Sequence, residues 1–132
     1  MRFLLDTCTV SDFVKGVPAV LQRIRQTEPE LLAVSAITRM EIEYGLALNA
    51  ERVRKFSPLL NAFFSVVATL NFEPADAEAS GALRASLRQQ GRPIGAYDVL
   101  IAGMALSRGL IVVTSNTGEF ERIAGLRVEN WR

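Results

Sequence analysis

Three acidic residues that lie far apart in the sequence are the first candidates for chemistry: Asp6, Glu41 and Asp98. Carboxylates held close together repel one another, so such a cluster is expected to bind a cation or to share a proton. Carboxylate oxygens suit hard divalent ions such as Mg²⁺ or Mn²⁺. A bound ion of this kind activates water and offsets charge on a phosphate. The three acids therefore predict metal-dependent phosphodiester hydrolysis, provided that the fold brings them together.

The chain contains no histidine and a single cysteine, Cys8. Without an imidazole, a Ser-His or Cys-His nucleophile pair is excluded, and a zinc site of the Cys/His kind is disfavoured. A lone cysteine cannot form an internal disulfide, which fits a reducing cytoplasm. Any enzyme built from this chain must work with carboxylates, amines, hydroxyls and backbone groups.

Two of the three acids also have a structural interpretation. Asp6 follows an apolar run and could cap the next helix, although Thr9 and Asp12 have the spacing of a capping box that would fill this role. Asp98 stands in the first turn of an apolar helix, where the helix dipole favours an acid. For each residue, the functional and the structural interpretation stay open.

Glu41 falls inside an apolar stripe on its predicted helix, together with Ile37, Met40, Tyr44 and Leu48. A carboxylate on a stripe that faces the core is costly unless something pairs with it. A buried arginine, a hydrogen-bond network, a metal or a shared catalytic cleft could each be that partner. The pattern favours a functional role for Glu41.

A second polar group follows the apolar run 110–114, which is the plainest buried strand in the sequence. Asn116 and Glu119 have capping-box spacing, so a structural role at the start of a short helical turn is expected for them. The same loop leaves the carboxyl end of a strand, where both side chains could instead orient water or a metal.

A basic stripe recurs every four residues at Arg84, Arg88 and Arg92, on the helix before Asp98. Such a stripe is commonly a solvated helix face. The alternative is contact with the phosphates of a nucleic acid, which gives affinity that depends on salt and hardly on sequence. With a net charge of only +1, a nucleic-acid partner would have to be held by a local patch of this kind.

These residues are positioned by short apolar runs that alternate with helix patterns. Strands are expected at 3–6, 31–34, 67–72, 110–114 and 126–129. Helices are expected from about Thr9, from Pro18, from 35 or 36 to 48, and at 51–67, 75–90 and 95–108. Pro58 should kink or split the helix at 51–67, and Gly109 should end the last helix.

Buried strands between helices indicate an α/β fold in which both faces of a parallel sheet are covered. In such folds the site lies beyond the carboxyl ends of the strands, where the strand order reverses. With 132 residues, of which 49% are hydrophobic, we expect a single domain over 1–132. No apolar run approaches the ~20 residues of a membrane span or the length of a signal peptide, so a cytoplasmic protein is expected.

Four segments together resemble the PIN-domain ribonucleases, and in particular the VapC toxins of bacterial type II toxin–antitoxin pairs. The segments are Leu4–Thr7, Ser35–Gly45, Gly91–Ala102 and Val113–Phe120, with Gly125–Leu126 and Glu129–Trp131 after them. Each segment is a weak signal alone. Their order and spacing extend the resemblance over nearly the whole chain.

The resemblance implies a three-layer αβα fold and endonucleolytic cleavage of RNA, often tRNA or ribosomal RNA, with Mg²⁺ or Mn²⁺ as cofactor. Asp6 and Asp98 match the metal-binding acids of the family, and Glu41 matches its third acid. Asn116 stands where many members carry a fourth acid, and Glu119 is the candidate to replace it. The implied partners are RNA, a second copy of the chain, and a VapB-like antitoxin that fills the acidic cleft in a heterotetramer or larger assembly.

Two alternatives stay open. One is a PIN-domain nuclease for RNA processing outside any toxin system, which an antitoxin gene beside this one would exclude. The other is a non-catalytic RNA- or protein-binding domain, against which the intact acids argue. An acidic phosphatase would need its own nucleophile motif, and none is evident.

Overall fold

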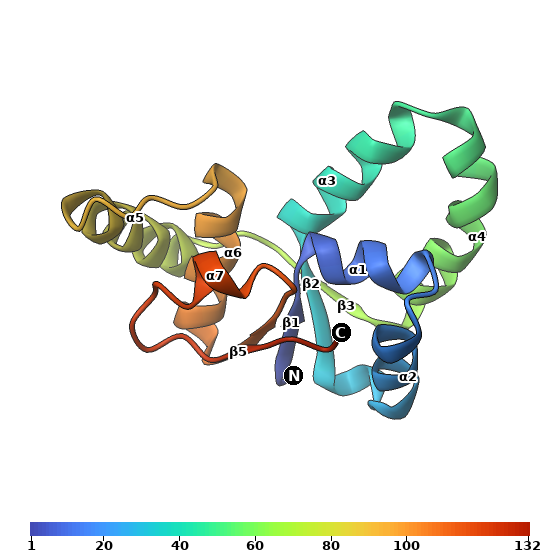
Figure 1. Cartoon of the computed structure of the whole chain (residues 1–132), viewed down its shortest axis with the longest axis horizontal. Coiled ribbons are helices and arrows are strands. Elements are labelled where there is room, and N and C mark those ends of the chain that lie inside the picture. The colour runs from blue at the N-terminus through green and yellow to red at the C-terminus, as the bar shows by residue number, and fades with distance from the viewer.

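Five short parallel strands form the centre of the computed structural model, which covers residues 1–132 (Figure 1). The strands are β1 (Phe3–Leu5), β2 (Leu32–Ser35), β3 (Ala68–Leu70), β4 (Ile111–Val113) and β5 (Val128–Glu129), in the spatial order β3-β2-β1-β4-β5. The chain builds outward from β1 through β2 to β3, and then from β4 to β5 on the other side of β1. The strand order therefore reverses beside β1, where α/β sheets bind their ligands.

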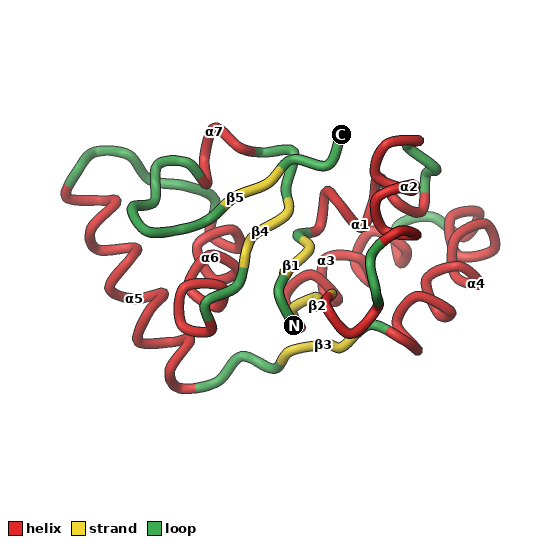
Figure 2. The backbone as a smooth tube through the Cα atoms, turned by 90° about the horizontal axis from the view of Figure 1, so that it is seen from below, coloured by secondary structure: helices red, strands yellow, loops and turns green.

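Helices cover both faces of this sheet (Figures 1 and 2). Three of them pack on one face: α1 (Thr7–Val14), α2 (Pro18–Gln26) and α4 (Ala50–Val66). Three others pack on the opposite face: α5 (Pro74–Gln89), α6 (Ala96–Arg108) and α7 (Thr117–Phe120). Helix α3 (Ala36–Ala47) continues directly from β2 at the carboxyl edge of the sheet and contacts α1, α4 and α6, and a short 3-10 helix (Pro29–Leu31) precedes β2.

Alternation along the strands divides the core into two clusters, because successive side chains of a strand point to opposite faces. Phe3 and Leu5 of β1 join the cluster under α1, α2 and α4, whereas Leu4 between them joins the cluster under α5, α6 and α7. All three are buried. The near-continuous apolar strands predicted from the sequence thus form a parallel sheet buried on both faces, which confirms the α/β three-layer prediction.

Several local predictions need correction. Pro58 does not split its helix, since α4 runs without interruption from Ala50 to Val66. The stripe through Met40, Tyr44 and Leu48 does not face the core, because these side chains are among the exposed large hydrophobic residues. Gly109 does end α6, as predicted, in the left-handed conformation with φ 66°. No helix is both long and apolar enough to cross a membrane.

Candidate active site at the carboxyl edge of the sheet

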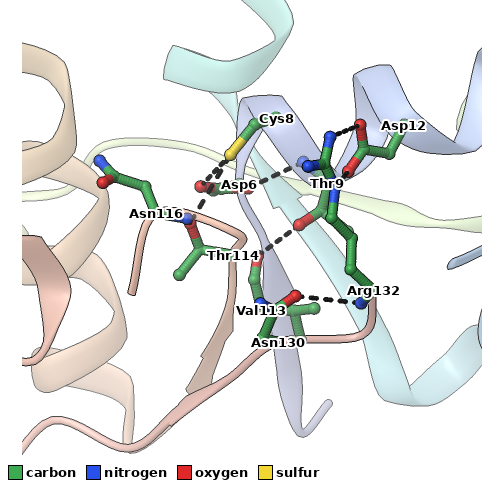
Figure 3. Close-up of polar contacts among 9 residues, drawn as sticks. All are labelled: Asp6, Cys8, Thr9, Asp12, Val113, Thr114, Asn116, Asn130 and Arg132. Carbon is green, nitrogen blue, oxygen red and sulfur yellow. Dashed lines mark hydrogen bonds and ion pairs between the residues drawn. The ribbon is translucent and has the colours of Figure 1, made fainter. Parts of the chain in front are cut away.

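Asp6 is fixed at the point where β1 ends and α1 begins. Its backbone N–H donates to the carbonyl of Val113 on β4 at 3.0 Å, and its Oδ1 accepts the backbone N–H of Thr9 at 2.9 Å. Asp6 is therefore the N-cap of α1, and the prediction that Thr9 and Asp12 form the capping box is wrong. The second oxygen, Oδ2, accepts the thiol of Cys8 at 3.0 Å (Figure 3). One oxygen of this buried carboxylate thus caps α1, and the other accepts the thiol.

Glu41 lies on α3 at the same edge, partly buried, and does not face the core. Its Oε1 accepts a hydrogen bond of 2.7 Å from the hydroxyl of Thr7, which also lies 3.2 Å from the hydroxyl of Thr38. Helix α3 is held at its start by Ser35, whose hydroxyl accepts the backbone N–H of Thr38 at 2.9 Å. The polar residues after β1 and β2 therefore fix Glu41 at the edge, where its carboxylate avoids the cost of unpaired burial.

Asp98 in the first turn of α6 lies beside the loop that follows β4. The side-chain amide of Asn116 donates to Glu119 Oε2 at 2.7 Å and, over a longer 3.4 Å, to Asp98 Oδ2. Asn116 makes no side-chain cap bond to α7, so the predicted Asn116–Glu119 capping box is wrong. Its amide instead joins two carboxylates at the edge of the sheet.

The carboxylates perturb one another. The pKa of Asp98 is raised from 3.8 to about 7. The largest cause is burial, followed by the hydrogen bond to Glu119 and the negative charges of Glu119, Asp6 and Glu41. The same hydrogen bond from Asp98, assisted by Asn116, lowers the pKa of Glu119. Asp98 and Glu119 therefore share a proton in the metal-free protein near neutral pH. This is the behaviour expected of acids that are held close together for a cation.

A cleft of ≈ 440 Å³ brings the predicted acids together. We call it the acidic cleft, and it is lined by Asp6, Thr7, Cys8, Ser11, Asp12, Lys15, Glu41, Asp98, Asn116 and Arg132. Glu119 does not line it but reaches it through Asp98 and Asn116. The position beside β1, at the reversal of strand order, agrees with the rule for ligand sites in α/β sheets.

The donor atoms of the acidic cleft fit Mg²⁺ or Mn²⁺ better than a softer metal. Asp6, Glu41, Asp98 and Asn116 offer carboxylate and amide oxygens, and the cleft has space for water. No three acidic, cysteine or histidine side chains are close enough to form a protein-only metal cage. Mg²⁺ seldom needs one, because it commonly binds one or two carboxylates and keeps several water ligands.

The basic stripe lies elsewhere. Arg84 and Arg88 are exposed and line a separate pocket of ≈ 230 Å³ between α5 and the start of α6, with Leu87 and Ile94 among its apolar lining. Arg92 is also exposed, but it follows the end of α5 and does not continue the helical stripe. None of the three arginines lines the acidic cleft.

Sequence reasoning missed several residues that line the cleft. Burial, together with the negative charge and hydrogen bond of Asp6, raises the pKa of Cys8, so this residue remains a thiol. Asp12 and Arg132 form a two-bond ion pair across 120 positions of sequence. Nothing in a single sequence links residues so far apart. The proximity of Cys8 to Asp6, by contrast, could have been inferred from their spacing around the start of α1.

Comparison with known proteins places this arrangement in a family. A model of the PIN domain matches residues 3–126. The tRNA(fMet)-specific endonuclease VapC of Shigella flexneri is 39% identical over 131 residues, which cover 99% of this chain and 98% of the relative. The protein of the same name from Salmonella typhimurium is 37% identical over 131 residues, with the same coverage.

Solved structures give the same result. The DNA-bound VapBC complex from Salmonella typhimurium contains a chain that superimposes with a TM-score of 0.91 at 38% identity, covering 100% of this chain and 99% of that one. A chain of VapBC2 from Rickettsia felis, bound to a DNA fragment from its promoter, gives a TM-score of 0.90 at 28% identity with complete coverage of both chains.

Proposed function

Because the chain belongs to the PIN-domain family, and to the VapC ribonucleases within it, we propose that its substrate is the initiator tRNA, tRNA(fMet). The chain is the endoribonuclease of a toxin–antitoxin pair, and its partner is a VapB-like antitoxin. Cleavage of initiator tRNA stops translation at its first step, which is the activity of a toxin in the cytoplasm. Two relatives named for tRNA(fMet) are 39% and 37% identical to this chain over nearly its full length, which supports this choice of RNA.

The proposed reaction rests on one observation: the acidic cleft is lined by Asp6, Glu41 and Asp98 together. A divalent ion, when bound there, supplies an activated water and offsets charge on the phosphate. Asp6 Oδ2 and the carboxylate of Asp98 are the groups to hold it. Glu41, oriented by Thr7, is placed to position the attacking water and to accept its proton.

Glu119 and Asn116 act on Asp98 and contribute no separate acid. In the metal-free protein, ionised Glu119 accepts a hydrogen bond from the protonated carboxyl group of Asp98. The amide of Asn116 donates to both side chains. A cation held by Asp98 would favour its ionised form, because positive charge stabilises a carboxylate. In this proposal, Glu119 fills the place of the fourth family acid by tuning Asp98.

The exposed apolar residues of α3 support a further part of the proposal, the homodimer. Met40, Tyr44 and Leu48 are 41%, 65% and 67% exposed and recur every four residues along α3 and its C-cap, so they form a row of exposed apolar side chains on one element. Covering them would remove apolar surface from water. Together with a VapB-like antitoxin, a dimer gives a heterotetramer or larger complex.

A cleavage assay with the purified chain and Mg²⁺ tests the function. Initiator tRNA and elongator methionine tRNA are compared as substrates, and cut sites are mapped by sequencing the new 5′ ends. We expect cleavage of initiator tRNA alone, loss of cleavage in EDTA, and recovery on addition of Mg²⁺ or Mn²⁺. Equal cleavage of both tRNAs would exclude the proposed specificity, and undiminished cleavage in EDTA would exclude the metal.

A pair of variants on α3 provides the matched control. Glu41→Gln removes the carboxylate from the acidic cleft, whereas Glu43→Gln makes the same change on the exposed side of the helix. We expect Glu41→Gln to lower kcat at least a hundredfold, the usual order for a proton-transfer group, and Glu43→Gln to leave kcat unchanged. Similar losses in both variants would show that α3 matters only for folding.

A further inference from the structure

The acidic cleft has a basic side that the reaction described above does not use. Besides its carboxylates, it is lined by two cations, Lys15 and Arg132. RNA is a polyanion, and carboxylates that are not fully neutralised repel it. Arg84 and Arg88 line a different pocket, so Lys15 and Arg132 are the cationic side chains that line the acidic cleft itself.

Arg132 is held in one orientation by Asp12 of α1. Its Nε donates to Asp12 Oδ2 at 2.8 Å and its Nη2 to Asp12 Oδ1 at 2.9 Å, a two-bond arrangement of the strong kind. The Asp12 side chain is only 8% exposed, whereas that of Arg132 is 55% exposed. A guanidinium has five N–H donors, so three remain after these two bonds. The outer edge of Arg132 is therefore fixed, charged and open to solvent.

The contact is not needed to attach the segment after β5, because Trp131 already does so. Trp131 is 5% exposed, packs edge-on against Phe3 with ring centroids 5.1 Å apart, and donates to Glu129 at 3.0 Å. The guanidinium of Arg23 lies over its ring at 4.8 Å. Arg132 extends beyond this anchor to the cleft. In Figure 3, Asp6 lies between Asn116 on one side and the Arg132–Asp12 pair on the other.

We propose that Arg132 binds a backbone phosphate of the RNA, next to the phosphate that is cut, with Asp12 holding the guanidinium in place and Lys15 supplying a second, movable cation. The inference rests on the proposed function and adds a substrate-binding residue to it. Fixing the side chain before binding lowers the entropy cost of each new hydrogen bond. Lys15 is exposed and forms no ion pair, so it is available for the strand on the same side of the cleft.

Binding of a labelled tRNA(fMet) transcript to the whole chain in EDTA tests this inference without cleavage. For Arg132→Ala we expect about tenfold weaker binding, as for loss of one charge-assisted hydrogen-bonded contact. The slope of log K against log salt should fall by about 0.7 to 0.9, the contribution of one phosphate. In cleavage with Mg²⁺, KM should rise by a similar factor, while kcat changes less than threefold.

Two further substitutions keep the test decisive if Arg132→Ala loosens the fold. Arg132→Gln can still donate to Asp12 but lacks the charge, and should show the same loss of affinity and slope. Arg132→Lys retains the charge without the two-bond geometry, so its affinity should lie between Arg132→Gln and the wild type. An affinity of Arg132→Gln equal to that of the wild type would overturn the proposal.

Arg23→Ala is the matched control, because Arg23 contacts Glu129 and Trp131 of the same segment but does not line the cleft. Its RNA affinity and salt slope should match the wild type within twofold. If Arg23→Ala loses as much affinity as Arg132→Ala, the effect comes from a loosened segment and the inference fails. If the wild type cuts no RNA at all, the proposed function fails, whatever the variants bind.

Discussion

Asp98→Asn should abolish cleavage in Mg²⁺ and, in the absence of metal, make the protein more stable. In the wild type the pKa of Asp98 is raised from 3.8 to about 7 by burial, by the hydrogen bond to Glu119 and by neighbouring charges. Between these two pH values the folded chain binds more protons than the unfolded chain, so the free energy of unfolding falls as the pH rises. Asparagine cannot ionise and can still donate a hydrogen bond to Glu119. The variant should therefore lack this destabilisation.

The size of the effect follows from the pKa. A rise of about three units, at 1.36 kcal/mol each, corresponds to an upper bound of roughly 4 kcal/mol above neutral pH. The lowered pKa of Glu119 offsets part of this, because the same hydrogen bond stabilises its ionised form, and solvent screens the partly buried Asp98. We expect Asp98→Asn to be more stable than the wild type by about 1 to 3 kcal/mol near pH 8, and equal to it near pH 4.

Urea unfolding in EDTA over this pH range measures the difference directly. Glu43→Gln, which removes an acid outside the cleft, should follow the wild-type curve. Mg²⁺ should stabilise the wild type more than Asp98→Asn, because a ligand stabilises only the state that binds it. If Asp98→Asn is no more stable than the wild type near pH 8 and shows the same pH slope, the carboxylates do not repel one another as described.

Two predictions concern the packing of α5 against α6. A Cβ at Gly103 would lie 2.8 Å from the backbone Cα of Ser80, so Gly103→Ala should lower stability by about 2 kcal/mol in thermal unfolding. Gly81→Ala, with no atom within 4 Å of the added Cβ, should be neutral or stabilising, and equal losses would contradict this. Burial alone would raise the pKa of Asp76, but hydrogen bonds from Arg108 and Ser107 outweigh it and lower the pKa below 3.8. Asp76→Asn should therefore lower the free energy of unfolding by about 3 kcal/mol at neutral pH, and by less as the pH falls below about 4. If urea unfolding gives the same loss of stability at every pH, the ion-pair explanation is wrong.

The sheet and most helices could be predicted from the sequence because their signals are local. The run at 110–114 contains β4, and the helix pattern at 95–108 matches α6 to within a residue at its start. Asp6 and Asp98 could be placed at one edge because each stands at the end or start of such an element. Parallel strands bring their carboxyl ends to the same edge.

The failed predictions share a physical cause. A helical stripe such as Met40, Tyr44 and Leu48 indicates an apolar face but does not identify what covers it, and here it is exposed. Capping-box spacing gives residues that can bond, not the bonds that they make. Asp12 pairs instead with Arg132, which no local pattern connects to it.

The same limit applies to the loop that follows β4. Asn116 has capping-box spacing to Glu119, but its side-chain amide donates to two carboxylates of the site, those of Asp98 and Glu119. Its competing partner, Asp98, comes from a different helix. Only the three-dimensional arrangement decides between such partners.

The central claim is that Asp6 and Asp98 hold a divalent cation in the acidic cleft. Crystals of the protein soaked in Mn²⁺ and measured at the manganese absorption edge test it most directly, because Mn²⁺ gives its own anomalous signal. We predict a peak within coordination distance of Asp6 and Asp98 in the wild type and its absence in Asp6→Asn. A wild-type protein that cuts RNA in Mn²⁺ but shows no peak in this cleft would contradict the account.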